Sequence, residues 1–278
     1  MKKISRRSFM AAAAVSVAAL ALTACGGSAS SAASSVASSA ASSEAASSAA
    51  VADLTTVEAG KLTMATNATF PPYEMTTDAG TIEGIDVDTA KAIAEKLGLE
   101  LQIDDMDFDA ALLSVQQGKA DIVMAGVTVT DERKAVMDFS DSYATGIQSI
   151  IVPEGSDITS PDDLAGKKIG TQRGTTGYIY CSDDFGDDNV VAYDNGLTAV
   201  QALNNGQVDA VVIDNAPAKE FVAANPGLVI LETSYAEEDY AIGMAKNSPL
   251  EDAINAALEE LKADGTLQSI VDKYITAE

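Results

Sequence analysis

From Leu54 onward, short β-branched runs alternate with stretches in which apolar residues recur every three or four positions. The short runs predict strands at 61–66, 99–103, 120–125, 149–152, 168–171, 190–192, 208–213 and 241–245. The periodic stretches predict helices at 86–97, 108–117, 175–181, 197–204, 216–224, 249–263 and 266–274, with Gly265 in a left-handed conformation between the last two. Strands and helices in alternation indicate an α/β fold with mainly parallel sheets.

Residues 1–24 lack this alternation and read as an export signal. Four basic residues, Lys2, Lys3, Arg6 and Arg7, precede an apolar stretch at 9–22 that is shorter than the roughly 20 residues of a membrane-spanning helix. The closing LTAC resembles the lipobox of bacterial lipoproteins, which implies cleavage before Cys25 and a lipid anchor on its thiol. An ordinary signal with an incidental cysteine is the alternative. The stretch SRRSFM looks like a twin-arginine motif, and the general secretory route stays equally open.

Residues 25–52 are expected to form a lipidated Cys25 followed by a tether, since positions 26–52 hold eleven Ser, eleven Ala and one charged residue. The remaining 226 residues (278 − 52) suffice for two lobes of about 100 residues each.

Charge and composition exclude several kinds of chemistry. Without the signal the chain carries 13 basic and 42 acidic residues, a balance of −29, which argues against a nucleic-acid partner. The absence of His excludes imidazole catalysis and His-ligated metal, and Cys25 and Cys181 are too few for a thiolate site. No metal or cofactor is expected. We expect Cys181 to be a buried free thiol, and the acidic pairs at 183–184 and 187–188, which lack EF-hand spacing, to be solvated surface.

Ligands of open parallel sheets bind beyond the carboxyl ends of the strands, so the loops that follow strands are the candidate site. Four such loops carry chemically useful groups: 67–73, 106–108, 125–133 and 172–177. The last is a Gly-rich turn that opens a helix, which suits an anion, although it lacks the GK[ST] of a Walker loop.

Arginine use strengthens this prediction. Beyond the signal the chain has eleven Lys and two Arg, and both Arg133 and Arg173 lie in these loops. A planar guanidinium can bind a carboxylate through two parallel hydrogen bonds, which Lys cannot do. The alternative to a binding role is a place on the surface for either arginine. Arg133 would then form an ion pair with Asp131 or Glu132.

Six runs together resemble the family 3 extracellular solute-binding proteins, the amino-acid receptors of ABC importers. They are TNATFPPYE, GIDVDTAKAIAEKLG, MDFDAALLSVQQGKADIVMAGVTVTDERKAVMDFSD, PDDLAGKKIGTQRGTTG, GQVDAVVIDNAPA and LKADGTLQSIVDKY. The resemblance implies a periplasmic-binding-protein-like type II fold, in which two α/β lobes are joined by a two-strand hinge. We expect one lobe at 53–150 plus 242–278 and the other at 151–241, with crossings near 149–153 and 240–246.

The resemblance also implies roles for single residues. Arg133 matches the arginine that binds the ligand α-carboxylate, and Asp214 matches the acid that pairs with the α-ammonium. The implied ligand-binding set is Asn67, Phe70, Phe108, Ala125, Gly126, Thr128, Arg133, Gln172, Thr175, Thr176 and Asp214. Within it, Phe70 and Phe108 would hold the ligand side chain, the Gly126 backbone and Thr128 hydroxyl would serve its carboxylate and amine, and Thr176 would supply an N–H to the carboxylate.

Simpler roles are open for some of these residues. Phe70 and Phe108 could be core rings, and Asp214 could cap the helix at 216–224. Gly126 could merely permit a turn. For Asp86, outside this set, we favour the capping of the helix at 86–97.

The sequence thus predicts an extracytoplasmic, lipid-anchored, monomeric receptor that delivers an L-amino acid to an ABC import permease. The resemblance implies that Asn67 and Gln172 approach the far end of the ligand, and because neither carries charge we expect a polar uncharged ligand, similar to glutamine or cystine. A dehydratase on the same fold, in which Arg133 holds a carboxylate and Asp214 protonates a leaving hydroxyl, and an amino-acid sensor module are the alternatives.

Overall fold

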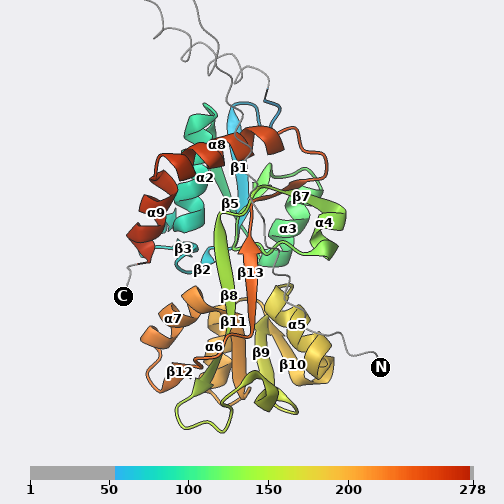
Figure 1. Cartoon of the computed structure of the whole chain (residues 1–278), viewed down its shortest axis with the longest axis vertical. Coiled ribbons are helices and arrows are strands. Elements are labelled where there is room, and N and C mark those ends of the chain that lie inside the picture. The colour runs from blue at the N-terminus through green and yellow to red at the C-terminus, as the bar shows by residue number, and fades with distance from the viewer. Residues whose placement is uncertain (1–53, 276–278) are drawn as a thin grey trace, which may run out of the picture. The chain divides into compact units, whose positions relative to one another are not determined.

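Two α/β lobes make up residues 54–275, the part of the chain that this computed structural model describes (Figure 1). The predicted signal, the tether and Cys25 lie outside the described residues. The first lobe has a five-stranded sheet in the order β5-β1-β6-β14-β7. Its strands are β1 (Lys61–Thr66), β5 (Glu100–Asp105), β6 (Ile122–Val123), β7 (Met137–Phe139) and β14 (Gly243–Ala245). Strand β1 pairs in parallel with β5 and β6, whereas β14 runs antiparallel to β6 and β7.

Helices from distant parts of the sequence complete the first lobe. They are α2 (Ile85–Lys96), α3 (Phe108–Gln116), α4 (Asp131–Val136), α8 (Glu251–Ala263) and α9 (Thr266–Tyr274). One core unites β1, α2, α8 and α9 through fully buried residues such as Leu62, Ile93 and Leu258, and Leu54 packs against it. Both ends of the described chain therefore belong to the first lobe.

The second lobe has a sheet in the order β10-β9-β11-β8-β12. Its strands are β8 (Ala144–Pro153), β9 (Ile169–Gln172), β10 (Val190–Tyr193), β11 (Ala210–Asp214) and β12 (Leu228–Ile230). The helices are η2 (Pro161–Leu164), α5 (Thr176–Phe185), η3 (Asp187–Asn189), α6 (Gly196–Asn204) and α7 (Asn215–Ala224). Two clusters of buried residues, centred on Ile151 and Ile150, form its core.

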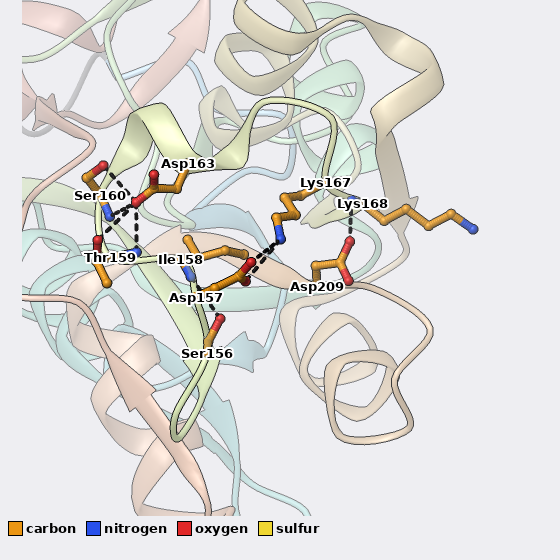
Figure 2. A network of polar contacts seen from close by, with 9 residues as sticks. All are labelled: Ser156, Asp157, Ile158, Thr159, Ser160, Asp163, Lys167, Lys168 and Asp209. Carbon is orange, nitrogen blue, oxygen red and sulfur yellow. Dashed lines mark hydrogen bonds and ion pairs between the residues drawn. The ribbon is translucent and has the colours of Figure 1, made fainter.

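A polar network shapes the turn that leads from β8 toward β9 (Figure 2). One oxygen of Asp163 accepts hydrogen bonds from the backbone N–H and hydroxyl groups of both Thr159 and Ser160, each at 3.0 Å, which closes a capping box at the start of η2. Asp157 and Lys167 form an exposed ion pair at 2.9 Å. These contacts join residues that are close in the sequence, so the network stabilises the turn between β8 and β9.

Two antiparallel strands join the lobes. Strand β13 (Ala236–Tyr240) pairs with residues 144–148 of β8, and Figure 1 shows the two strands side by side between the sheets. We expected the first crossing near 149–153, but those residues pair with β11 and β12 inside the second sheet. The crossing lies about five residues earlier because β8 continues without a break from the hinge into the sheet. The second crossing, between Tyr240 and Gly243, falls within the predicted 240–246.

The loop after β1 forms a small sheet of its own that the sequence pattern did not predict. Strands β2 (Thr69–Phe70), β3 (Glu74–Thr76) and β4 (Ile82–Glu83) are consecutive and antiparallel. They hold the aromatic loop against the first lobe, where Phe70 stacks on Tyr73 with ring centroids 5.8 Å apart.

Most predicted elements are confirmed, within a few residues at their ends. Gly265 is left-handed (φ 80°), Cys181 is a buried free thiol, and the two acidic pairs are exposed, as predicted. Among the described residues, no helix combines the length and apolar character that crossing a membrane requires.

Candidate functional site

A pocket lies between the lobes and is lined by residues of both, and about 30 Å³ of it is open to water-sized molecules. All eleven residues predicted from the sequence line it, and so do Glu74, Gln148, Val212, Ile213 and Tyr240. The loops that follow β1, β6, β9 and β11 all reach this pocket, as the rule for the carboxyl ends of strands requires. Their roles in binding stay predictions.

Arg133 supplies a buried cation at one side of the pocket. Its side chain is 8 % exposed, Nη1 donates to the Thr128 carbonyl at 2.7 Å, and Nη2 donates to the Gly174 carbonyl of the second lobe at 3.2 Å. Burial lowers the pKa of Arg133, and the charge of Glu238 is the strongest opposing influence. The ion pairs among residues 54–275 do not include Arg133, so the alternative of a surface pair is wrong for it. That alternative fits Arg173, which is exposed and lies 3.6 Å from Asp194.

Thr128 and Thr176 bring the two lobes together. Thr128 follows β6 in the first lobe, and Thr176 is the first residue of α5 in the second. Their hydroxyl oxygens lie 3.3 Å apart, and both hydroxyls donate to one oxygen of Glu238. Thr175 caps α5 by accepting from the Tyr178 N–H at 3.3 Å, which points the positive end of the ten-residue helix at the pocket.

Asp214 supplies a buried carboxylate at the end of β11. One oxygen accepts from the Ala216 N–H at 2.9 Å, so the capping role is confirmed, and the other accepts from the Ile147 N–H at 2.8 Å. Burial raises the pKa of Asp214 to about 6, although these two N–H groups oppose the rise. The group can therefore cap α7 and still face the pocket.

Asp86 does not cap α2, contrary to our expectation. Gly84 occupies the N-cap position, and the fully buried Asp86 carboxylate instead accepts from the Gly126 N–H at 3.0 Å and the Tyr143 hydroxyl at 2.7 Å. The side chain turns inward because these two donors compensate its burial more fully than the helix terminus would. Since Asp86 occupies the Gly126 N–H, the Gly126 carbonyl is the part of that backbone left for a ligand.

Gly126 itself is required by the packing of the pocket. Its φ is +56°, and a Cβ there would lie 2.9 Å from the Phe70 ring and 3.2 Å from the Tyr240 ring. Both the backbone conformation and the close contacts exclude a larger residue without rearrangement. Gly126 therefore does more than permit a turn.

Phe70 and Phe108 are both core residues and pocket walls. Phe108 belongs to a buried cluster of the first lobe, and the Arg133 guanidinium lies 5.4 Å from its ring centroid. Phe70 packs against the cores of both lobes. Each ring can therefore belong to the core and also line the pocket where a ligand side chain would lie.

Asn67 and Gln172 bind one another across the lobes. Gln172 Nε2 donates to Asn67 Oδ1 at 2.9 Å, and Asn67 Nδ2 donates to the Met106 carbonyl at 2.9 Å. Their polar groups are therefore largely satisfied within the protein. They line the pocket but leave few hydrogen-bonding sites for the far end of a ligand.

Glu74 is a buried acid that our sequence analysis missed. It is 0 % exposed, it lines the pocket, and neither carboxyl oxygen accepts a hydrogen bond from a donor group among the described residues, although the Asp86 carboxyl lies close enough to share a proton with it. Burial, then the neighbouring Asp86, raises its pKa well above the usual value. The PPYE run carried the available signal, since Glu74 is an ionisable residue directly after the aromatic loop.

No three metal-binding side chains cluster within residues 54–275. The pocket offers instead a buried cation, Arg133, two buried acids, Glu74 and Asp214, and a helix N-terminus. Such a set suits a small zwitterion.

Comparison with known proteins agrees with this geometry. Residues 62–277 match the bacterial extracellular solute-binding proteins, family 3. The probable histidine-binding protein of Neisseria gonorrhoeae is 34% identical over 275 residues, 96% of this chain and 95% of its own.

Two solved structures share the fold. One is the arginine-, lysine-, histidine-binding protein ArtJ of Geobacillus stearothermophilus, 35% identical with a TM-score of 0.75, covering 78% of this chain and 96% of its own. The other is an ancestral arginine-binding protein bound to glutamine, 43% identical with a TM-score of 0.75, covering 79% and 100%. These relatives have the type II bilobal fold and are binding proteins rather than enzymes. The chain belongs to the bacterial extracellular solute-binding proteins, family 3.

Proposed function

We propose that this protein is the receptor of an ABC importer, and that it captures an L-amino acid with a basic side chain between its two lobes. The observation that carries the proposal is the pocket between the lobes, which places buried Arg133 and buried Asp214 around one space. Its partners would be the amino acid and the permease. A lipid on Cys25 would hold the protein, as a monomer, at the outer face of the cell membrane.

The α-carboxylate would bind at Arg133. Two of the five guanidinium N–H donors bind the carbonyls of Thr128 and Gly174, which leaves three for a ligand. The Thr176 N–H and the N-terminus of α5 would bind the same carboxylate from the second lobe. Because only the closed arrangement makes both sets of contacts, ligand binding and closure would be linked.

The α-ammonium would bind at Asp214. This carboxylate is buried beside Ile147, and an ammonium within hydrogen-bond distance would stabilise its ionised form. The ligand would then supply the opposite charge for each buried group of the site. An enzyme on this fold would need a substrate whose leaving group lies near Asp214, and no contact in the pocket favours it.

The part of the pocket that would hold the ligand side chain favours a basic amino acid. This replaces the polar uncharged ligand that we expected from the sequence. That preference rested on Asn67 and Gln172, and these are already hydrogen-bonded to one another. Glu74, by contrast, is a buried acid of the pocket wall that lies beside the Asp86 carboxyl and takes part in no ion pair of the described residues. A buried acid without a partner gains most from an incoming cation.

Glutamine is the second candidate ligand. Glu74 would favour it if its carboxyl is protonated when the ligand binds. Burial raises the pKa of Glu74, which favours its protonated form, and a protonated carboxyl could donate to an amide oxygen. The ancestral relative bound to glutamine shows that a pocket of this family can hold an amide.

A thermal-shift screen tests the receptor proposal. The protein is unfolded and refolded to remove bound ligand, then mixed with each of the twenty amino acids, with cystine and with several small carboxylates. A ligand at a hundredfold excess over Kd should add about 2.7 kcal/mol to the free energy of unfolding. A response to carboxylates that lack the amine, with none to any amino acid, would contradict the proposal.

Glu74→Gln tests the side-chain assignment by calorimetry with L-arginine and L-glutamine. Binding of arginine should release a proton, because burial favours protonated Glu74 and the cation favours its ionised form, and this release should be absent for glutamine. The variant should lose at least tenfold affinity for arginine and less for glutamine. Glu83→Gln, on β4 and outside the pocket lining, is the matched control. Equal losses for both ligands would overturn the assignment.

A further inference from the structure

Glu238 is a buried acid of the hinge that lies outside the pocket lining. It lies on β13 and is 7 % exposed. Its Oε2 accepts three hydrogen bonds, from the Thr128 hydroxyl at 3.1 Å, the Thr176 hydroxyl at 3.0 Å and Gln148 Nε2 at 2.9 Å. All three donors line the pocket, so Glu238 lies directly behind its wall.

The three donors come from different parts of the fold. Thr128 belongs to the first lobe, where residues 127–129 pair with the end of β13 through Val129 N–H to Asp239 O and Ala241 N–H to Val127 O. Thr176 belongs to the second lobe, and Gln148 lies on the hinge strand β8. A single carboxylate oxygen therefore joins both lobes at the hinge.

The hydrogen bonds to Glu238 determine how the two hydroxyls can meet a ligand. A hydroxyl has one proton and two lone pairs, and an ionised carboxylate can only accept. When both protons point at Glu238, neither hydroxyl has a proton for the other across their 3.3 Å contact or for the ligand. Both oxygens then face the pocket as acceptors, which suits an ammonium and not a carboxylate.

We propose that Glu238 is a positioning residue for ligand recognition: by taking the hydroxyl protons of Thr128 and Thr176, it makes both oxygens acceptors for the ligand α-ammonium. This inference rests on the proposed function, since it assumes a ligand with an α-ammonium at this end of the pocket. It separates the two ends of the zwitterion, with Arg133 for the carboxylate and the hydroxyl pair, together with Asp214, for the amine.

The test compares each amino acid with the same molecule without its α-amine. The probes are L-arginine with 5-guanidinopentanoic acid, and L-glutamine with glutaramic acid, titrated calorimetrically into wild type and Glu238→Gln. We expect the variant to lose at least tenfold affinity for the amino acid and less than threefold for the deaminated probe. Glu237→Gln is the matched control, because it removes the same charge from the exposed face of the same strand.

A role in hinge packing alone would weaken both probes of a pair equally, and that result would overturn the proposal. So would unchanged affinity for both. If wild type binds none of the twenty amino acids in the thermal-shift screen, the proposed function itself fails and the inference fails with it. If wild type binds L-arginine or L-glutamine and Glu238→Gln leaves the preference for the α-amine intact, only the inference fails.

Replacement of the hydroxyls checks that Glu238 acts through them. In a Thr128→Val, Thr176→Val background, Glu238→Gln should cost less than threefold further affinity for the amino acid, because no hydroxyl remains to be positioned. A full tenfold loss there would show that Glu238 acts by another route. Should Glu238→Gln not fold, the single valine variants carry the test: each should weaken the amino acid and spare the deaminated probe, and equal losses would overturn the proposal.

Discussion

At the scale of single residues, the two arginines beyond the signal illustrate how burial separates a site from a surface. Arg133 is buried, donates to carbonyls of both lobes and has no acidic partner in an ion pair of the described chain. Arg173 is exposed beside Asp194. A buried cation without a paired acid is unfavourable unless something else compensates it, which is what a ligand carboxylate would do.

Arg133→Ala should lower affinity for the cognate amino acid by about a hundredfold, roughly 3 kcal/mol, because it removes a charge-assisted pair in a water-poor pocket. Titration calorimetry measures the effect. Arg173→Ala is the control and should bind within about twofold of wild type, since exposed pairs contribute little. Near wild-type affinity in Arg133→Ala would refute the carboxylate assignment.

Gly126→Ala should lower both stability and affinity. The alanine would need a left-handed backbone, and its Cβ would press against Phe70 and Tyr240. We expect a loss of about 2 kcal/mol or more from the free energy of urea unfolding. Gly155→Ala is the matched control, because Gly155 also has positive φ (78°) but open space around it, so it should show the backbone cost alone. Equal losses in the two variants would mean that the contacts around Gly126 are unimportant.

The sequence predicts the site at this scale wherever a residue follows a strand. Phe70, Arg133, Thr176 and Asp214 lie at the carboxyl ends of strands or in the segments that follow them, and they converge because those strand ends do. Glu238 could not be found this way, because its partners are 62 to 110 positions away in the chain.

At the scale of elements, the start of α5 combines a helix cap with a pocket wall. Thr175→Ala should lower the free energy of unfolding by about 1 kcal/mol, because the Tyr178 N–H loses its acceptor. It should also weaken ligand binding, since the following Thr176 N–H would no longer be held in place. Thr175→Ser keeps the acceptor and should restore both, as measured by urea unfolding and calorimetry. Failure of serine to restore stability would assign the effect to the lost methyl group.

Helices and strands with a strong apolar periodicity could be predicted from the sequence. Strands that form only because they pair with a neighbouring strand in the fold were missed. Strand β1 matches its predicted range because five of its six residues are buried. Strand β13, with the sequence AEEDY, has little apolar character and becomes a strand by pairing with β8. The alternation that buries Glu238 and Tyr240 was the available signal, and it covers too few residues to stand out.

At the scale of the whole molecule, the chain has a net charge of −25. Two of its acidic residues, Asp86 and Asp214, are buried and take part in no ion pair of the described residues. Burial raises the pKa values of Asp86 and Asp214 to about 6, from an ordinary value of 3.8. The folded chain therefore binds these protons more tightly than the unfolded chain does. Their contribution to stability is complete below about pH 4 and is lost as the pH rises through about 6.

We therefore expect the ligand-free protein to unfold at a lower temperature at pH 7 than at pH 5, with about 1.3 kcal/mol lost from each group between these two pH values. Asp86→Asn should flatten this dependence, whereas Asp183→Asn, at an exposed position, should not. Thermal unfolding followed by circular dichroism measures both. A midpoint that stays constant or rises between pH 5 and pH 7 would contradict the expectation.

Because both ends of the described chain pack on the first lobe, the second lobe is an insertion that the chain enters and leaves through adjacent strands. Fluorophores attached near the two ends would therefore keep a constant separation whatever the lobes do. A pair with one dye near Leu54 and the other in the turn around Gly155, where a side chain meets open space, would instead change its energy transfer with ligand. The topology thus dictates where an optical sensor for the amino acid can be built into this scaffold.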